Sequence, residues 1–130
     1  MGTIFSRIVN GEIPAYKIAE TDDFLAFLDV NPLAEGHTLV IPKKETDYIF
    51  DIDDDLYQGL FLFSKKVAAA LRKSIPCKKI GVAVIGLEVP HAHIHLIPMN
   101  SVSDMNFASP KLRLSESRFR ETLEKIKAHI

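Results

Sequence analysis

The sequence predicts an α+β protein in which about five strands form a mostly antiparallel sheet, with one long central helix and a C-terminal helix. Short β-branched and apolar runs occur in two groups, and turn residues separate the runs within each group. The two longer helical patterns follow these groups and do not alternate with single strands. Such grouping is typical of α+β proteins, whereas parallel α/β sheets alternate strand and helix.

The N-terminal half contains a short helix and three predicted strands. Apolar residues at helical spacing predict about one and a half turns over 4–9, and an Asn-Gly pair then predicts a turn. The runs over 16–20 and 24–29 are joined by the tripeptide TDD and are interpreted as a hairpin. After a loop with Pro32 and Gly36, the run "HTLVIP" over 37–42 predicts a buried strand.

The longest helix is predicted over 53–74. Asp53 or Asp54 can cap its first turn, and Pro76 prevents its continuation. One face has the 3–4 spacing that packs on a core, and its residues are Leu56, Leu60, Phe63, Val67 and Leu71.

Two further strands and a last helix complete the chain. The strands are predicted over 79–85 and 91–97, and the segment 100–114 has no regular pattern. Ser115 can cap the last helix. The apolar stripe of this helix consists of Phe119, Leu123 and Ile126.

Length and composition predict one globular domain over residues 1–130. The net charge of −1 argues against a nucleic-acid partner, which usually requires a basic surface. The single cysteine, Cys77, excludes an internal disulfide, and no apolar window reaches the length of a membrane span. We therefore expect a cytoplasmic protein with no nucleic-acid or membrane partner.

Three of the five histidines occupy alternate positions in "EVPHAHIHLIP", as His91, His93 and His95. Alternate residues of a strand share one face, so the three imidazoles would project together. The opposite face would carry apolar residues, namely Ala92, Ile94 and Leu96. Three interpretations are open: a solvated strand face, a zinc site completed by His37, or a set of groups that handles phosphate.

The phosphate interpretation rests on the chemistry of imidazole. Neutral imidazole is a nucleophile near pH 7, and a protonated neighbour can neutralise phosphoryl oxygens. Phosphoryl transfer depends mainly on positioning and charge stabilisation, which clustered imidazoles can supply. A zinc site would require neighbouring imidazoles of one strand to tilt towards a single ion, so we place it behind phosphate.

The run "HAHIHLI" resembles the His-φ-His-φ-His-φ-φ signature of the histidine triad (HIT) family, in which φ is apolar. The block "TIFSRIVNGEIPAYKIAETDDFLAFLDVNPLAEGHTLVIPKK" resembles the N-terminal half of that family nearly throughout. The resemblance covers about residues 3–99 and leaves 100–130 as a divergent C-terminal segment. It implies a HIT-like fold and a small homodimeric nucleotide hydrolase or transferase.

The same resemblance implies the roles of individual residues. His93 would attack the α-phosphate, His95 would contact phosphate oxygens and help the leaving group, and His91 and His37 would support the site, the His91 backbone fixing the tautomer of His93. Asp29 would hold ribose hydroxyls, although a turn cap before Asn31-Pro32 explains it as well. Five apolar residues would enclose the base, with plain core as the alternative: Ile4, Phe5, Ile8, Ile13 and Leu39.

The sequence also departs from the family pattern. Many relatives have a loop that ends in Ala-Gly-Gln before the triad, whereas here the loop is shorter and Leu87 stands in the place of the glutamine. Leu87 has no hydrogen-bond donor in its side chain. Some relatives bind structural zinc through a Cys-x-x-Cys pair and a further histidine, and the matching residues here are Thr3, Ser6 and Glu45. We therefore expect neither a metal nor another cofactor.

The expected function is hydrolysis at the α-phosphate of a nucleoside phosphoramidate, anhydride or dinucleoside polyphosphate, through a nucleotidyl-His93 intermediate. The expected ligand is a purine nucleotide or nucleotide conjugate. Leu87 motivates one alternative, a nucleotide-binding protein with weak or no catalysis. The other alternative is a zinc-dependent enzyme that uses the triad as ligands.

Overall fold

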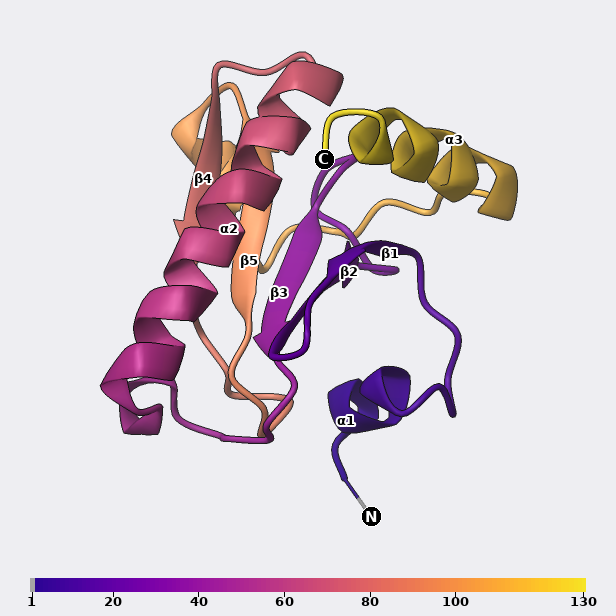
Figure 1. Ribbon diagram of the computed structural model, residues 1–130. Helices are drawn as coiled ribbons and strands as arrows, with labels where there is room; N and C mark the ends of the chain where they lie inside the picture. The colour runs from indigo at the N-terminus through magenta and orange to yellow at the C-terminus, as the bar shows by residue number, and fades with distance from the viewer. Residues whose placement is uncertain (1) are drawn as a thin grey trace.

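The computed structural model describes residues 2–130, and Met1 lies outside this range. Its five strands form one sheet in the order β1-β2-β3-β5-β4, and all neighbouring strands are antiparallel (Figure 1). The strands are β1 (Lys17–Glu20), β2 (Phe24–Leu28), β3 (Thr38–Pro42), β4 (Lys79–Ala83) and β5 (Ile94–Met99). The predicted α+β fold with its antiparallel sheet is confirmed.

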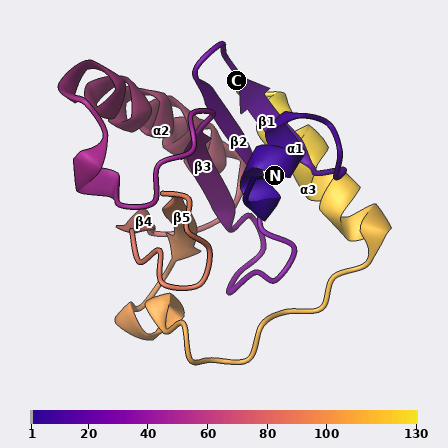
Figure 2. The ribbon, with the colours of Figure 1, turned by 90° about the horizontal axis from the view of Figure 1, so that it is seen from below.

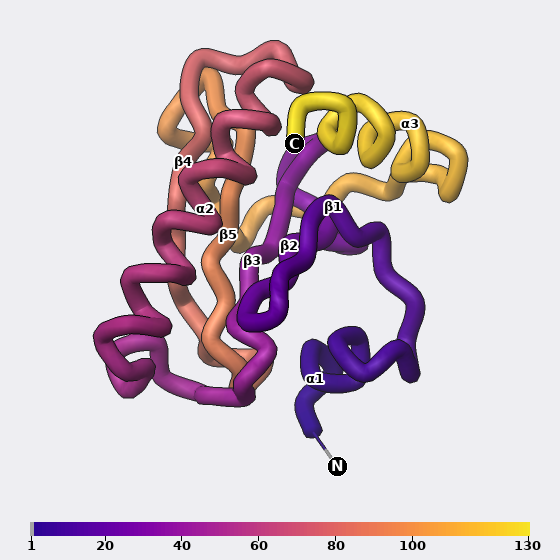
Figure 3. Tube along the Cα trace, viewed as in Figure 1, coloured from indigo at the N-terminus to yellow at the C-terminus, as the bar shows by residue number. Residues whose placement is uncertain are grey.

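The helices begin where the sequence places capping residues. They are α1 (Ile4–Val9), α2 (Asp54–Ser74) and α3 (Glu116–Lys127), with short 3-10 helices η1 (Ile49–Asp51) and η2 (Val102–Met105). Side-chain oxygens of Thr3, Asp53 and Ser115 accept hydrogen bonds from backbone N–H groups of the first turns. Figure 3 follows the chain from α1 to α3. The predicted caps at Asp53 and Ser115 are confirmed, and η2 lies in a segment predicted to be irregular.

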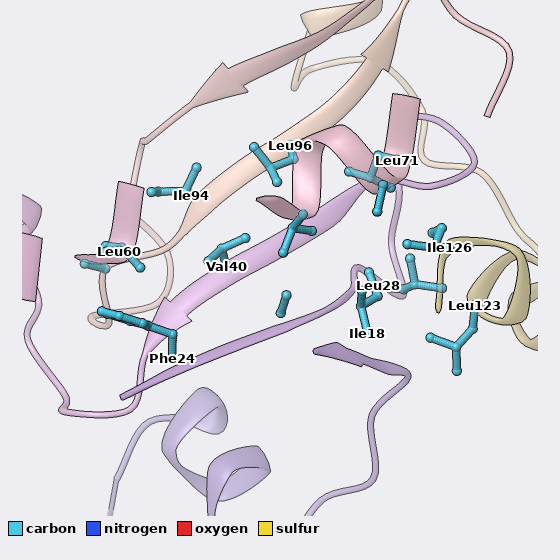
Figure 4. Close-up of a cluster of buried hydrophobic side chains, with 14 of the residues drawn as sticks. Ile18, Phe24, Leu28, Val40, Leu60, Leu71, Ile94, Leu96, Leu123 and Ile126 are labelled. Atoms are coloured by element: carbon cyan, nitrogen blue, oxygen red, sulfur yellow. The ribbon is translucent and has the colours of Figure 1, made fainter. Parts of the chain in front are cut away.

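Helices α2 and α3 pack on one face of the sheet and enclose the main core (Figure 4). Each buried aliphatic side chain there contributes about 1.5–3 kcal/mol relative to an exposed one. The predicted stripe of α3 is buried, and so are Leu60, Val67 and Leu71 of α2. The strands contribute Leu28, Val40, Ile94 and Leu96.

Helix α1 covers part of the opposite face of the sheet. Phe5 and Ile8 of α1 pack there in a second apolar cluster. The strand residues of that cluster are Leu25, Phe27, Leu39 and Ile41. Strands β2 and β3 are therefore buried on both faces, which explains their continuous apolar sequences.

The strand predicted over 91–97 is shorter at its start and longer at its end, because β5 begins at Ile94 and ends at Met99. Pairing with β3 stops at Ile94, opposite Val40. Before that point Ala92 donates its N–H to the carbonyl of Thr46, outside the sheet. Similarly, β4 ends at Ala83 and not at 85. His91 and His93 therefore lie in the loop that leads into β5.

None of the helices within residues 2–130 is both long enough and apolar enough to cross a membrane.

Candidate active site

A cavity of about 470 Å³ opens on the sheet face that α1 covers, a volume usual for small-molecule sites. Helix α1 and the loop 84–89 form two of its walls, and the C-terminal end of β2 and the start of β3 line its base with His93 and His95. Phe107 and Lys111 line it from the connection between η2 and α3. Figure 2 shows this connection running around the end of the sheet before it reaches α3.

All three histidines of the triad are buried, so the interpretation as a solvated strand face is wrong. The three histidines still point away from the apolar residues between them, even though only His95 belongs to a strand. The three apolar residues that alternate with them lie in the main core, and they are Ala92, Ile94 and Leu96. His93 and His95 line the cavity, with their ring centroids 4.9 Å apart.

His37 and His95 form a hydrogen-bonded pair whose direction is fixed by the backbone. The Leu33 N–H donates to Nδ1 of His37 at 3.0 Å, so the proton of the neutral His37 ring resides on Nε2. This Nε2–H donates to Nδ1 of His95 at 2.9 Å. The remaining proton of His95 must then be on Nε2, which makes that atom a donor.

His91 and His93 are oriented by carbonyl oxygens. Nδ1–H of His93 donates to the carbonyl of His91 at 2.7 Å, which leaves Nε2 of His93 with a free lone pair. Nε2–H of His91 donates to the carbonyl of Pro42 at 2.8 Å. Within residues 2–130 no buried side-chain N or O atom lacks a partner. Because neither Nε2 of His93 nor Nε2 of His95 is bonded to protein, both atoms are accessible to solvent.

Burial keeps three of these imidazoles neutral. Loss of water contact, helped by the positive charge of Lys111, lowers the pKa of His37 to about 3. Desolvation likewise lowers the pKa of His95 to about 4 and shifts that of His91 downward. The neutral His95 therefore presents an N–H donor on Nε2, and its ring lies next to that of His93, with centroids 4.9 Å apart.

The position of His91 depends on a polar network at the start of α1. The hydroxyl of Thr3 donates to Nδ1 of His91 at 2.8 Å and accepts the N–H of Ser6 at 3.1 Å. Glu45 accepts both the Thr3 N–H at 2.8 Å and the Ser6 hydroxyl at 2.7 Å. Thr3, Ser6 and Glu45 are thus joined by hydrogen bonds beside His91.

Asp29 and His37 flank the loop between β2 and β3, and Asp29 N–H donates to the carbonyl of His37 at 2.9 Å. One carboxylate oxygen of Asp29 accepts the N–H of Asn31 at 2.8 Å, as a turn cap does. The other lies 3.5 Å from Nε2 of His37, which is not an ion pair because buried His37 is neutral. Burial also raises the pKa of Asp29. Asp29 both caps the turn and lines the cavity.

The five apolar residues expected around a base all line the cavity, and they are Ile4, Phe5, Ile8, Ile13 and Leu39. Three of them are also buried in the second cluster. The ring of Phe5 meets that of His93 edge to face, with centroids 4.9 Å apart. The apolar wall and the histidines are thus in direct contact.

Leu87 lies in the short loop before the triad, and its side chain is 89% exposed. It lines the mouth of the cavity together with Glu88. The loop therefore brings no side-chain amide towards the histidines, as expected from the missing glutamine.

Among residues 2–130 one group of three side chains could hold a metal ion, Asp29, His37 and His95. Its hydrogen bonds do not suit a metal. A metal on Nε2 of His37 would place the ring proton on Nδ1, where it would oppose the Leu33 N–H. His91 and His93 are outside the group, so the triad itself does not form a ligand set, contrary to the zinc interpretation.

Three residues that contribute to the site could not be identified from the sequence. Leu33 acts through its backbone, so its side chain gives no signal. Phe107 and Lys111 lie in a stretch without periodicity, at a position that depends on the folded chain.

Comparison with known proteins gives one consistent result. A family model described as HIT domain matches residues 10–102. An uncharacterised HIT-like protein of Borreliella burgdorferi is 36% identical, with 98% of this chain and 97% of that protein covered. An adenosine 5′-monophosphoramidase of Schizosaccharomyces pombe is 32% identical, with 100% and 99% covered. The crystal structure of a Hit-like protein from Bartonella henselae has a TM-score of 0.86 at 30% identity, with 98% and 96% covered.

Proposed function

Because this chain belongs to the HIT family, we propose that it hydrolyses a nucleotide at the α-phosphate through a nucleotidyl-His93 intermediate. The substrate would be a nucleoside phosphoramidate, anhydride or dinucleoside polyphosphate. A relative named as an adenosine 5′-monophosphoramidase supports nucleotide hydrolysis at the level of the family. One observation supports the step itself: His93 presents an accessible Nε2 lone pair, because its Nδ1–H is bonded to the His91 carbonyl.

In the first step, the Nε2 lone pair of His93 forms a bond to the α-phosphorus. The bond from phosphorus to the leaving group breaks, and its electron pair departs with the leaving group. The imidazole becomes cationic, and its Nδ1–H remains bonded to the His91 carbonyl, which stabilises the charge. Nε2–H of His95 donates a hydrogen bond to a phosphoryl oxygen or to the leaving atom.

In the second step, water attacks the same phosphorus and the bond from phosphorus to His93 breaks. The electron pair returns to Nε2, and the proton of the water passes to solvent. His95 does not gain a second proton, because Nδ1–H would then face Nε2–H of His37. The leaving group therefore takes its proton from water.

The test uses an adenosine phosphoramidate and compares wild type with His93→Ala and His93→Gln. Wild type is expected to hydrolyse it and, when the reaction is stopped, to show a mass increase of one nucleotidyl group. Both variants should lose at least about a thousandfold in kcat. His129→Gln is the control, because His129 is exposed at the C-terminal end of the described residues. Unchanged turnover in His93→Ala would exclude the proposal.

A second candidate is a nucleotide-binding protein with weak or no catalysis. The exposed Leu87 favours it, because a lost hydrogen-bond donor in a site of this kind costs on the order of a hundredfold in rate. Calorimetry with AMP separates the two functions when it is paired with the assay above. Tight binding without turnover would support the second candidate.

We propose that two copies associate through the β4 edge of the sheet. β4 lies at the end of the strand order, so one side of its backbone is unpaired. Large apolar side chains are exposed on and after it, namely Val82, Val84, Ile85 and Leu87. Light scattering should give twice 14.6 kDa for wild type. Val82→Lys should give a monomer, and Val102→Lys, at an exposed site in η2, should not.

A further inference from the structure

The connection between η2 and α3 forms part of the cavity. The ring of Phe107 meets that of His95 edge to face at a centroid distance of 4.8 Å, and lies 6.3 Å from that of His37. Lys111, a little further along the same connection, also lines the cavity. The segment therefore reaches the histidines directly.

Hydrogen bonds hold this segment in place. The N–H of Leu112 donates to the carbonyl of Pro32 at 2.8 Å, which ties it to the loop between Asp29 and His37. The ammonium group of Lys111 donates to the carbonyls of Phe107 at 2.5 Å and Ser109 at 3.1 Å. Lys111 is exposed to solvent, and the two bonds leave the third proton of its ammonium group available to a ligand.

Lys111 is the one basic Lys or Arg side chain among the described residues that line the cavity. Two acidic side chains, Asp29 and Glu88, line the same cavity. The positive charge of Lys111 contributes to lowering the pKa of His37 and opposes the rise in that of Asp29. Without Lys111, the cavity lining would contain two carboxyl groups and no lysine or arginine to attract an anionic ligand.

We infer that Lys111 is a specificity-determining residue that makes this cavity favour phosphate-bearing ligands over uncharged nucleosides. A lysine ammonium acts on phosphate as a point charge, so its contribution grows with the charge of the ligand. The inference rests on the proposed nucleotide site and adds the residue that selects the charge of the ligand. It also gives a role to a segment outside residues 10–102, which the family model matches.

The expected kinetic effect follows from the position of Lys111. Its interaction with the nucleotide exists before and during the reaction, so its loss should raise KM and change kcat little. The interaction is partly exposed to solvent and is therefore screened by salt. In wild type the affinity for AMP should fall as salt rises, and in Lys111→Met this dependence should be weaker.

The experiment measures calorimetric affinity for adenosine, AMP and ADP, which differ in charge. Lys111→Met should weaken AMP binding about tenfold and ADP binding more, and adenosine binding less than about twofold. Lys111→Arg keeps the charge and should bind AMP nearly as wild type does. Arg113→Met is the matched control, because it removes one charge close in sequence but outside the cavity lining.

Three results would overturn the inference. Equal losses for adenosine and AMP would show that Lys111 only supports the connection between η2 and α3. An equal loss in Arg113→Met would show that net charge is sufficient, and unchanged AMP binding in Lys111→Met would show that Lys111 is not involved. If wild type binds neither adenosine nor AMP, the proposed nucleotide site fails. If wild type binds AMP and Lys111→Met binds it equally well, only the role of Lys111 fails.

Discussion

The four histidines of the site receive their tautomers from fixed backbone groups. The Leu33 N–H and two carbonyl oxygens determine where each ring proton resides. The result is a pair of unlike nitrogens, a lone pair on His93 and a donor on His95. The donor on His95 needs no charged imidazole, which agrees with the lowered pKa values of His37, His91 and His95.

A His95 that stays neutral near pH 7 predicts how the rate depends on the leaving group. Adenosine 5′-phosphate aryl esters with phenols of different pKa would measure this dependence. The rate should fall steeply as the pKa of the phenol rises, by about tenfold or more for each two units, because no internal acid protonates the departing oxygen. A rate independent of the phenol would show that His95, or another group, delivers a proton.

The Thr3 hydroxyl predicts a measurable link between α1 and the triad. Thr3→Val removes the donor to His91 and the acceptor for the Ser6 N–H at nearly constant volume. The free energy of unfolding in urea should fall by about 2 kcal/mol, and amide exchange in α1 should accelerate.

Thr3→Ser keeps the hydroxyl and is the matched control. Since α1 carries Phe5, AMP affinity should fall in Thr3→Val and not in Thr3→Ser. A Thr3→Val protein as stable as wild type would show that the hydroxyl does not hold the helix in place.

At the level of elements, sequence patterns predicted the helices and strands within a few residues. The apolar residues between the histidines correctly indicated the core side, because that side is fixed by burial alone. The start of β5 could not be predicted, because the partner of Ala92 is Thr46, which is distant in sequence. The convergence of Thr3, Glu45 and His91 likewise depends on contacts between distant parts of the chain.

Helix α3 should be essential to stability even though it lies outside the residues that the family model matches. Ile126 is fully buried between α2, α3 and the sheet, so Ile126→Ala should lower the free energy of unfolding by about 3 kcal/mol. Lys127→Ala, exposed on the same helix, should change it by less than about 0.5 kcal/mol. Urea unfolding measures both. Similar values for the two variants would show that α3 is not integral to the core.

For the whole molecule, the buried imidazoles predict a loss of stability in acid. In the unfolded chain His37 and His95 titrate near 6.5, and in the folded chain near about 3 and about 4. Between these values the unfolded chain binds more protons, so stability is full above pH 6.5 and falls as the pH is lowered towards 4. Each group contributes at most about 1.4 kcal/mol per pH unit.

Urea unfolding between pH 7 and pH 4 measures this slope. His37→Asn removes one buried titrating group and should give a shallower slope, whereas the exposed His129→Asn should keep the slope of wild type. A pH-independent stability would show that these rings are not held neutral by burial. The cytoplasmic location, by contrast, stays a prediction of composition alone.

The walls of the cavity come from opposite ends of the chain, α1 on one side and the segment with Phe107 and Lys111 on the other. During synthesis, which proceeds from the N-terminus, the histidines emerge before this last wall and before α3. A nascent chain stalled just after β5 would already contain the nucleophile. It would lack the charge that selects the ligand and the helix that completes the core, so binding competence should be acquired only after α3 has been synthesised.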